Sequence, residues 1–89
     1  MEYCAEYAPR ALDDLLKMER KAARLVIRKI NAYCDSGRPL SFAKPLKGDL
    51  AGAYRFRIGD YRVIFDLGKR NRVVILFVLR VGHRRDIYG

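Results

Sequence analysis

The fold is decided by one stretch in the middle of the chain, Leu46-Lys-Gly-Asp-Leu-Ala-Gly-Ala-Tyr-Arg-Phe-Arg-Ile-Gly-Asp-Tyr-Arg-Val-Ile-Phe65. It predicts a loop, a strand over residues 53–58, a tight turn at Gly59-Asp60 and a second strand over residues 61–66. Strand side chains alternate between faces, so Arg55 and Arg57 point away from the apolar residues between them. A two-residue turn places Arg62 on the same face as these two arginines.

Three guanidinium groups on one face of a hairpin do not help the chain to fold. They repel one another, and each is costly to bury without a partner. Guanidinium groups bind phosphate through paired N–H donors, so this face predicts contact with a polyanion.

The charge of the chain supports that prediction. The 89 residues are enough for one domain over residues 1–89, and they carry a formal net charge of +9. The excess is uneven, because residues 1–43 hold eight basic and six acidic residues, whereas residues 44–89 hold eleven and four. The expected partners are therefore nucleic acid or an acidic protein, although a basic surface that serves only solubility remains an alternative.

The two cysteines favour a reducing compartment. Cys4 and Cys34 lie thirty residues apart, each in an apolar pattern, and predict buried free thiols and a cytoplasmic protein. No zinc motif, signal peptide or membrane-spanning run is recognisable, so we expect no metal, no cofactor and no membrane partner.

Apolar periodicity gives the other elements. We expect a short strand over residues 2–7, a helix that has Pro9 in its first turn and continues over residues 10–18, and a second helix over about 19–33 that forms an antiparallel pair with the first. Residues 37–52 predict a surface loop, residues 68–71 a turn, and residues 72–81 a central, nearly continuous apolar strand. The predicted class is α+β, with an N-terminal strand, a two-helix hairpin and a three-stranded antiparallel meander in one sheet.

The polar groups that can converge are mostly arginines. The candidate catalytic residues are Arg55, Arg57, Arg62, His83, Arg84 and Tyr88, and the candidate RNA-binding residues are Lys44, Lys47, Arg55, Arg57, Arg80 and Arg85. This set suits RNA cleavage without metal. The 2′-hydroxyl of the RNA attacks the adjacent phosphate, arginines stabilise the extra charge, and a histidine moves a proton. The products would be a 2′,3′-cyclic phosphate and a 5′-hydroxyl.

Simpler roles stay open for several of these residues. His83 could be a surface residue at a strand end, Tyr88 could pack the tail on the sheet, and Arg55 and Arg57 could form an ordinary exposed face. The aromatic residues of the hairpin could stack on bases or belong to the core.

Three motifs, Leu46-Lys-Gly48, Tyr54–Phe65 and Val81-Gly-His-Arg-Arg-Asp-Ile-Tyr88, resemble the RelE branch of the RelE/ParE toxin superfamily, as does the order of elements. The resemblance implies a RelE/ParE-like, microbial-RNase-like fold and a type II toxin. It implies a ribosome-dependent endoribonuclease that cleaves messenger RNA in the 30S A site and inhibits translation. It also implies an acidic, RelB-like antitoxin that covers the basic face.

The same resemblance carries the family's catalytic positions to the six candidate residues above. Many members have lysines where this chain has Arg55 and Arg57, and a lysine is one proposed general base. Arginine stays protonated, so the base role shifts to His83, with Tyr88 or Arg84 assisting the leaving group. The alternatives are a ParE-like toxin that inhibits gyrase without cleaving RNA, a non-catalytic RNA-binding module, and a decayed toxin that keeps only antitoxin binding.

Overall fold

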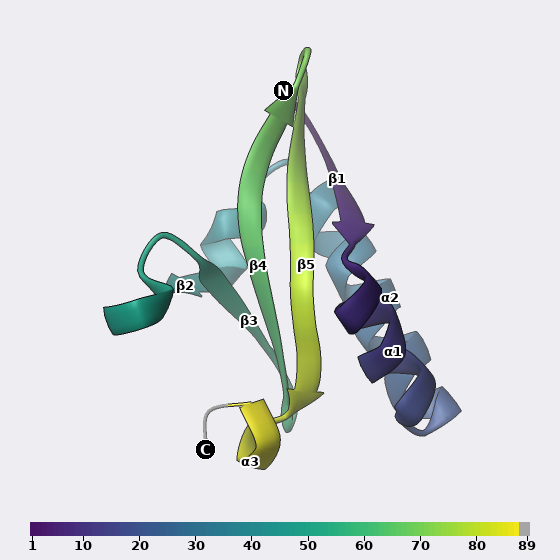
Figure 1. The fold of residues 1–89 in the computed structure, drawn as a ribbon. Coiled ribbons are helices and arrows are strands. Elements are labelled where there is room, and N and C mark those ends of the chain that lie inside the picture. The colour runs from purple at the N-terminus through teal and green to yellow at the C-terminus, as the bar shows by residue number, and fades with distance from the viewer. Residues whose placement is uncertain (88–89) are drawn as a thin grey trace.

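The computed structural model describes residues 1–87 and shows a five-stranded sheet with two helices against one face (Figure 1). The elements are β1 (Glu2–Tyr7), α1 (Pro9–Lys17), α2 (Arg20–Asp35), β2 (Ala43–Pro45), β3 (Tyr54–Ile58), β4 (Tyr61–Arg70), β5 (Val73–His83) and α3 (Arg84–Ile87). Two 3₁₀ turns, η1 (Pro39–Phe42) and η2 (Gly48–Leu50), flank β2. The predicted α+β class is confirmed. None of the described helices is long and apolar enough to cross a membrane.

The strand order is β1-β5-β4-β3-β2, with β1 parallel to β5 and every other pair antiparallel. The prediction of a plain surface loop over residues 37–52 is wrong, because β2 lies inside it. Lys44 pairs with Arg55 and Pro45 pairs with Tyr54. Proline is tolerated there because β2 is an edge strand, where one side needs no backbone donor.

The hairpin of β3 and β4 turns where the sequence predicts. Gly59 has a φ of +58°, which suits the first central residue of a type II′ turn. The next turn differs from its prediction, because β4 continues to Arg70 and the chain reverses at Asn71, whose φ is +56°. Gly68 lies within the strand, and a Cβ there would meet the ring of Phe77 at 2.7 Å.

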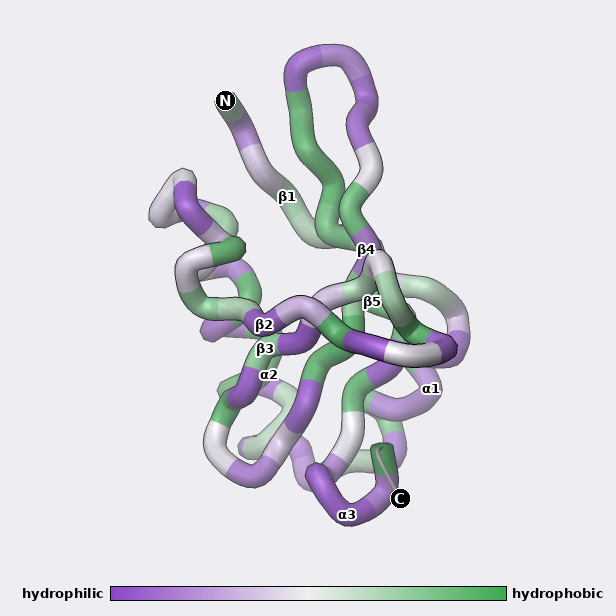
Figure 2. Tube along the Cα trace, turned by 90° about the vertical axis from the view of Figure 1, so that its left-hand side faces the viewer, coloured by the Kyte–Doolittle hydropathy of each residue, from purple (hydrophilic) through white to green (hydrophobic). Residues whose placement is uncertain are grey.

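The outer half of the hairpin between β4 and β5 projects beyond β3. The pairing of β3 with β4 ends at Phe65, whereas β4 and β5 stay paired to Arg70 and Val73. Figure 1 shows this extension, and Figure 2 shows that its tip is hydrophilic while its strands are largely hydrophobic. The tip is therefore a polar projection at the opposite end of the hairpin from the turn between β3 and β4.

The core lies between the helices and the sheet. Ala11 and Leu15 of α1 are buried, as are Val26, Ile30 and Cys34 of α2, which recur every four residues and so share one face of the helix. They pack against a row of sheet residues, namely Phe56, Ile58, Val63, Phe65, Leu76, Val78 and Val81. Aromatic side chains of the hairpin belong to this core: the rings of Phe56 and Phe65 stack with centroids 4.4 Å apart, and Tyr54 stacks on Phe65 at 5.7 Å.

The cysteines differ from each other. Cys34 is 6% exposed, and burial raises the pKa of its thiol to about 11, with smaller contributions from Cys4 and Asp35. It is a protonated, unreactive thiol at neutral pH. Cys4 is only half-buried, so the prediction of full burial holds for Cys34 and not for Cys4.

A β-bulge divides β5 into two parts. Ile64 pairs with Arg80 and Phe65 pairs with Val78, so Leu79 is an extra residue on β5 that has no partner on β4. The residues that face the core are Leu76 and Val78 before the bulge and Val81 after it. The bulge therefore inverts the faces that the end of β5 presents.

Helix α1 replaces β1 at the edge of β5. The last contact of the strand pair is the bond from the N–H of Ala8 to the carbonyl of Val78, at 2.9 Å. Beyond it, Oδ2 of Asp14 accepts from the N–H of Val81 and from Nε of Arg80, both at 2.9 Å. Partial burial alone would raise the pKa of Asp14, but these hydrogen bonds and the charges of Arg80 and Arg10 outweigh it and lower that pKa below its ordinary value.

Candidate functional site

The candidate site lies on the face of the sheet that the helices leave open. Arg55 and Arg57 alternate along β3 with the buried Phe56 and Ile58, so they point away from the core. Arg57 pairs directly with Arg62 of β4, and cross-strand partners point to the same side. The predicted common face of these three arginines is confirmed by this register.

A fourth arginine, Arg84, is held near these three by a backbone hydrogen bond. The N–H of Arg84 donates to the carbonyl of Asp60 at 2.8 Å, which docks the start of α3 on the turn between β3 and β4. Gly82 pairs with Arg62, and Ile87 packs so closely on it that a Cβ at Gly82 would lie 2.9 Å from Cγ1 of Ile87. Helix α3 therefore closes this end of the sheet (Figure 1). We call Arg55, Arg57, Arg62 and Arg84 the arginine cluster.

Arg62 is the anchored member of the cluster. Its residue is only 8% exposed, and its Nη1 donates to the carbonyls of Gly59 and Tyr61, each at 3.0 Å. Burial lowers the pKa of Arg62, and the like charges of Arg57, Arg55 and Arg84 lower it further, with Asp60 opposing. A guanidinium still keeps its proton at neutral pH, so Arg62 is a fixed and partly desolvated cation.

Within residues 1–87, no acidic side chain forms an ion pair with a member of the cluster, and Asp60 acts on Arg62 only through its charge. The ion pairs in this part of the chain join Arg70 to Glu6 at 2.8 Å and Arg80 to Asp14 at 2.9 Å, and neither includes a member of the cluster. Like charges that face each other across strands destabilise a sheet. The arrangement is therefore suited to an anion that several guanidinium groups bind together, such as a phosphate.

The other predicted RNA-binding residues are dispersed. Lys44 pairs with Arg55 through β2 and so extends the basic face. Lys47 is exposed ahead of η2, and Arg85 is exposed on α3. Arg80 is held by Asp14 and is not free for another anion in this conformation. Tyr88 lies outside the described residues.

His83 does not share the face of the arginine cluster. It pairs with Tyr61, one step from the pair of Arg62 with Gly82, so it points to the helix side. Its ring meets that of Tyr61 edge-on, with centroids 5.8 Å apart. Nδ1 of His83 accepts from the backbone N–H of Arg85 at 3.3 Å and from its Nε at 3.4 Å, which assigns the proton to Nε2. The expected convergence of this imidazole with the arginines is thus not found.

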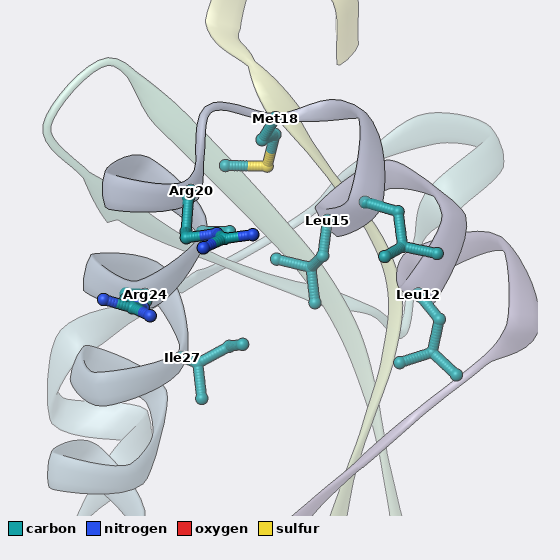
Figure 3. Close-up of a pocket in the computed structure, with 8 residues that line it drawn as sticks. Leu12, Leu15, Met18, Arg20, Arg24 and Ile27 are labelled. Atoms are coloured by element: carbon teal, nitrogen blue, oxygen red, sulfur yellow. The ribbon is translucent and has the colours of Figure 1, made fainter.

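A groove lies between α1 and α2, on the helix side of the sheet. It has a volume of about 630 Å³, and Figure 3 shows its apolar floor with two arginines alongside. The lining residues are Leu12, Leu15, Leu16, Met18, Arg20, Ala23, Arg24 and Ile27. Leu16 is 83% exposed, which is unusual for a leucine. The sequence interpretation missed this groove, although adjacent Leu15 and Leu16 cannot both face one core.

Comparisons with known proteins agree on one family. The model for the family described as "ParE toxin of type II toxin-antitoxin system, parDE" matches residues 5–88. Toxin RelG of Mycobacterium tuberculosis is 35% identical over 89 residues, which cover 99% of this chain and 98% of the relative.

Solved structures give the same result. A chain of the toxin–antitoxin complex RelBE2 from Mycobacterium tuberculosis is 29% identical, with a TM-score of 0.74 over 94% of this chain and 100% of that one. A chain of the RelB–RelE antitoxin–toxin complex from Methanococcus jannaschii is 27% identical, with a TM-score of 0.64 over 92% and 93%. The chain therefore belongs to the RelE/ParE superfamily of type II toxin–antitoxin toxins.

Proposed function

We propose that this toxin is a ribosome-dependent endoribonuclease that cleaves messenger RNA in the A site. The observation that supports the proposal is the arginine cluster, which holds four cations with no acidic partner in residues 1–87. A folding role does not account for a buried arginine beside three others. A phosphodiester that gains charge during reaction does.

The cluster fits a cleavage in which the RNA supplies its own nucleophile. The 2′-oxygen attacks the neighbouring phosphorus, the bond from phosphorus to the 5′-oxygen breaks, and a 2′,3′-cyclic phosphate and a 5′-hydroxyl result. Arg62 stabilises the charge on the phosphorane from a fixed position, and Arg55, Arg57 and Arg84 bind the flanking phosphates or the same group.

Two protons must also move, one from the 2′-hydroxyl and one to the 5′-oxygen. His83 and Tyr88 are the candidates for these transfers. In the described conformation, Nδ1 of His83 is occupied by Arg85 and its ring points to the helix side. His83 acts as the base only after it turns around the end of the sheet, so the conformation of α3 is part of the proposal.

A ParE-like function is the second candidate, and the matching family model favours it. In that case the toxin would bind gyrase and cleave no RNA. The arginine cluster favours the nuclease, because protein binding alone does not require a desolvated guanidinium beside three like charges.

Primer extension on programmed ribosomes separates the two functions. We expect cleavage in the A site with the wild-type protein and a loss of about 10²-fold or more with Arg57→Ala. Arg70→Ala is the matched control, since Arg70 is exposed and lies outside the cluster. A supercoiling assay with gyrase runs in parallel. Inhibition of gyrase without any cleavage of RNA would refute the nuclease.

The proposed partner is an acidic antitoxin of the RelB kind, and the groove between α1 and α2 is its proposed contact surface. Leu12 and Ile27 are 49% and 37% exposed there, beside the highly exposed Leu16. Arg20 and Arg24 lie along the same groove (Figure 3). An amphipathic acidic helix would bury these apolar side chains and pair with the two arginines.

Leu16→Asp is therefore expected to weaken antitoxin binding by about 30-fold or more, because a buried anchor becomes a desolvated charge. The binding partner in this test is the cognate RelB-like antitoxin, and calorimetry is the measurement. Leu50→Asp is the control, since Leu50 is 44% exposed but lies on η2, away from the groove. A loss of affinity with Leu50→Asp and none with Leu16→Asp would move the contact surface elsewhere. Cleavage of RNA should survive both changes.

A further inference from the structure

A second, smaller pocket lies at the end of β5, and the residues that line it include the sequence neighbours of Arg62 and Arg84. It has a volume of about 350 Å³ and is bounded by the end of α1, the first residue of β4, the last residues of β5 and α3. It exists because β1 covers the edge of β5 only as far as Val78 and Asp14 covers it only at Val81. The last residues of β5 thus have an open edge.

The pocket adjoins the cluster through neighbouring residues. Tyr61 and His83 line it and form one cross-strand pair, and Arg62 with Gly82 forms the next. Successive pairs along a strand are separated by roughly 3.3 Å and their side chains alternate between faces, so Tyr61 and His83 point to the helix side while Arg62 points to the open face. The pair of Tyr61 with His83 is also the last in the sheet, so a flexible chain can bend around this end.

The charge of the pocket differs from that of the rest of the molecule. Its lining holds three carboxylates, those of Asp14, Glu19 and Asp86, but only two cations, Lys17 and Arg80. In a chain with a net charge of +9, this lining is unfavourable for phosphate and supplies hydrogen-bond acceptors instead.

Two of the carboxylates are available. Asp14 already accepts from Arg80 and from the N–H of Val81. Glu19 and Asp86 are exposed at the pocket, and neither belongs to an ion pair among the described residues. The same pocket is lined by the edge-on rings of Tyr61 and His83 and by the apolar side chains of Met18 and Ile87.

We propose that this pocket receives the nucleobase next to the phosphate that the arginine cluster binds, and that it selects bases with an exocyclic amino group. A base in such a pocket rests on the ring of Tyr61 and on apolar side chains, and it is read on its Watson–Crick edge. Glu19 and Asp86 accept from the amino groups of guanine, adenine or cytosine, which uracil lacks. The role of the pocket in cleavage rests on the proposed function. The binding of a nucleobase in the pocket does not depend on cleavage and can be tested separately.

Titration of the free protein with 5′-GMP, AMP, CMP and UMP, followed by amide NMR shifts, tests the binding. We expect Tyr61, His83 and Asp86 to shift with the three amino-bearing nucleotides and much less with UMP. All four should shift the arginine cluster, since all carry phosphate. The double variant Glu19→Gln and Asp86→Asn should lose this discrimination, whereas Asp49→Asn, an exposed carboxylate on η2, should keep it.

The cleavage profile on programmed ribosomes gives the second measurement. In the double variant, cleavage beside uracil should rise about tenfold relative to cleavage beside the other bases. Equal shifts with all four nucleotides, or discrimination that survives in the double variant, would overturn the inference. Base-specific shifts without any cleavage of RNA would support the nucleobase pocket and would refute only the proposed nuclease function.

Discussion

Replacing Arg62 by methionine is expected to reduce RNA cleavage by about 10²–10³-fold, the cost of losing one fixed donor to a developing charge. The stability of the free protein should change little. The variant loses two hydrogen bonds, to the carbonyls of Gly59 and Tyr61, each contributing roughly 1 kcal/mol. It also loses a desolvated cation and its repulsion by Arg57, Arg55 and Arg84. The measurements are single-turnover cleavage on ribosomes and the midpoint of urea unfolding.

Two further variants make this prediction specific. Arg62→Lys keeps the charge without the planar pair of donors and should recover only a small part of the activity. Arg70→Met changes an exposed arginine that pairs with Glu6 far from the cluster and should leave cleavage unchanged. If Arg62→Met lost activity together with several kcal/mol of stability, Arg62 would have to be regarded as a structural residue.

Replacing Asp14 by alanine is expected to have the largest effect on stability. Asp14 accepts from Arg80 and from the N–H of Val81, at the edge that β1 leaves uncovered. Loss of these charge-assisted bonds should cost about 2–3 kcal/mol. For a domain of this size that lowers Tm by roughly 10–20 °C. Asp13→Ala is the control, since Asp13 is exposed one residue away and should change stability by less than about 0.5 kcal/mol.

The same carboxylate gives a pH dependence. Folding lowers the pKa of Asp14. The contribution of this carboxylate to the free energy of unfolding is therefore fully present above the unfolded pKa of about 3.9, and it is lost as the pH falls through the lower folded pKa. The free energy of unfolding of the wild type should therefore decrease in acid, and that of Asp14→Asn should decrease less over the same range. Identical slopes for the two proteins would contradict the assignment.

Local chemistry was enough to predict most of the fold. The turn at Gly59, the strands on either side of it and the two helices follow from residue type and periodicity. Strand β2 does not, because Ala43-Lys-Pro45 has no strand pattern of its own and is defined only by its pairing with β3. The sequence also predicts too short a β4, because Gly68 is typical of a turn. In the structure Gly68 lies within the strand, where the ring of Phe77 leaves no room for a Cβ.

The site was predicted in part. Alternation along β3 placed the arginines correctly, whereas His83 was expected on their face. Continuing the alternation of Leu76 and Val78 would place residue 83 on the open face, but the extra residue at Leu79 turns it to the helix side. A bulge depends on pairing between strands and leaves no mark in the residue pattern.

The long hairpin of β4 and β5 has a consequence for how the toxin responds to salt. From Arg62 to Arg70 the strand advances eight residues, or roughly 26 Å at about 3.3 Å per residue. The Debye length at physiological ionic strength is about 8 Å, so the basic tip and the arginine cluster are electrically independent. Charges at the tip can therefore set how fast the protein meets a polyanion while leaving the reacting phosphate's local field untouched.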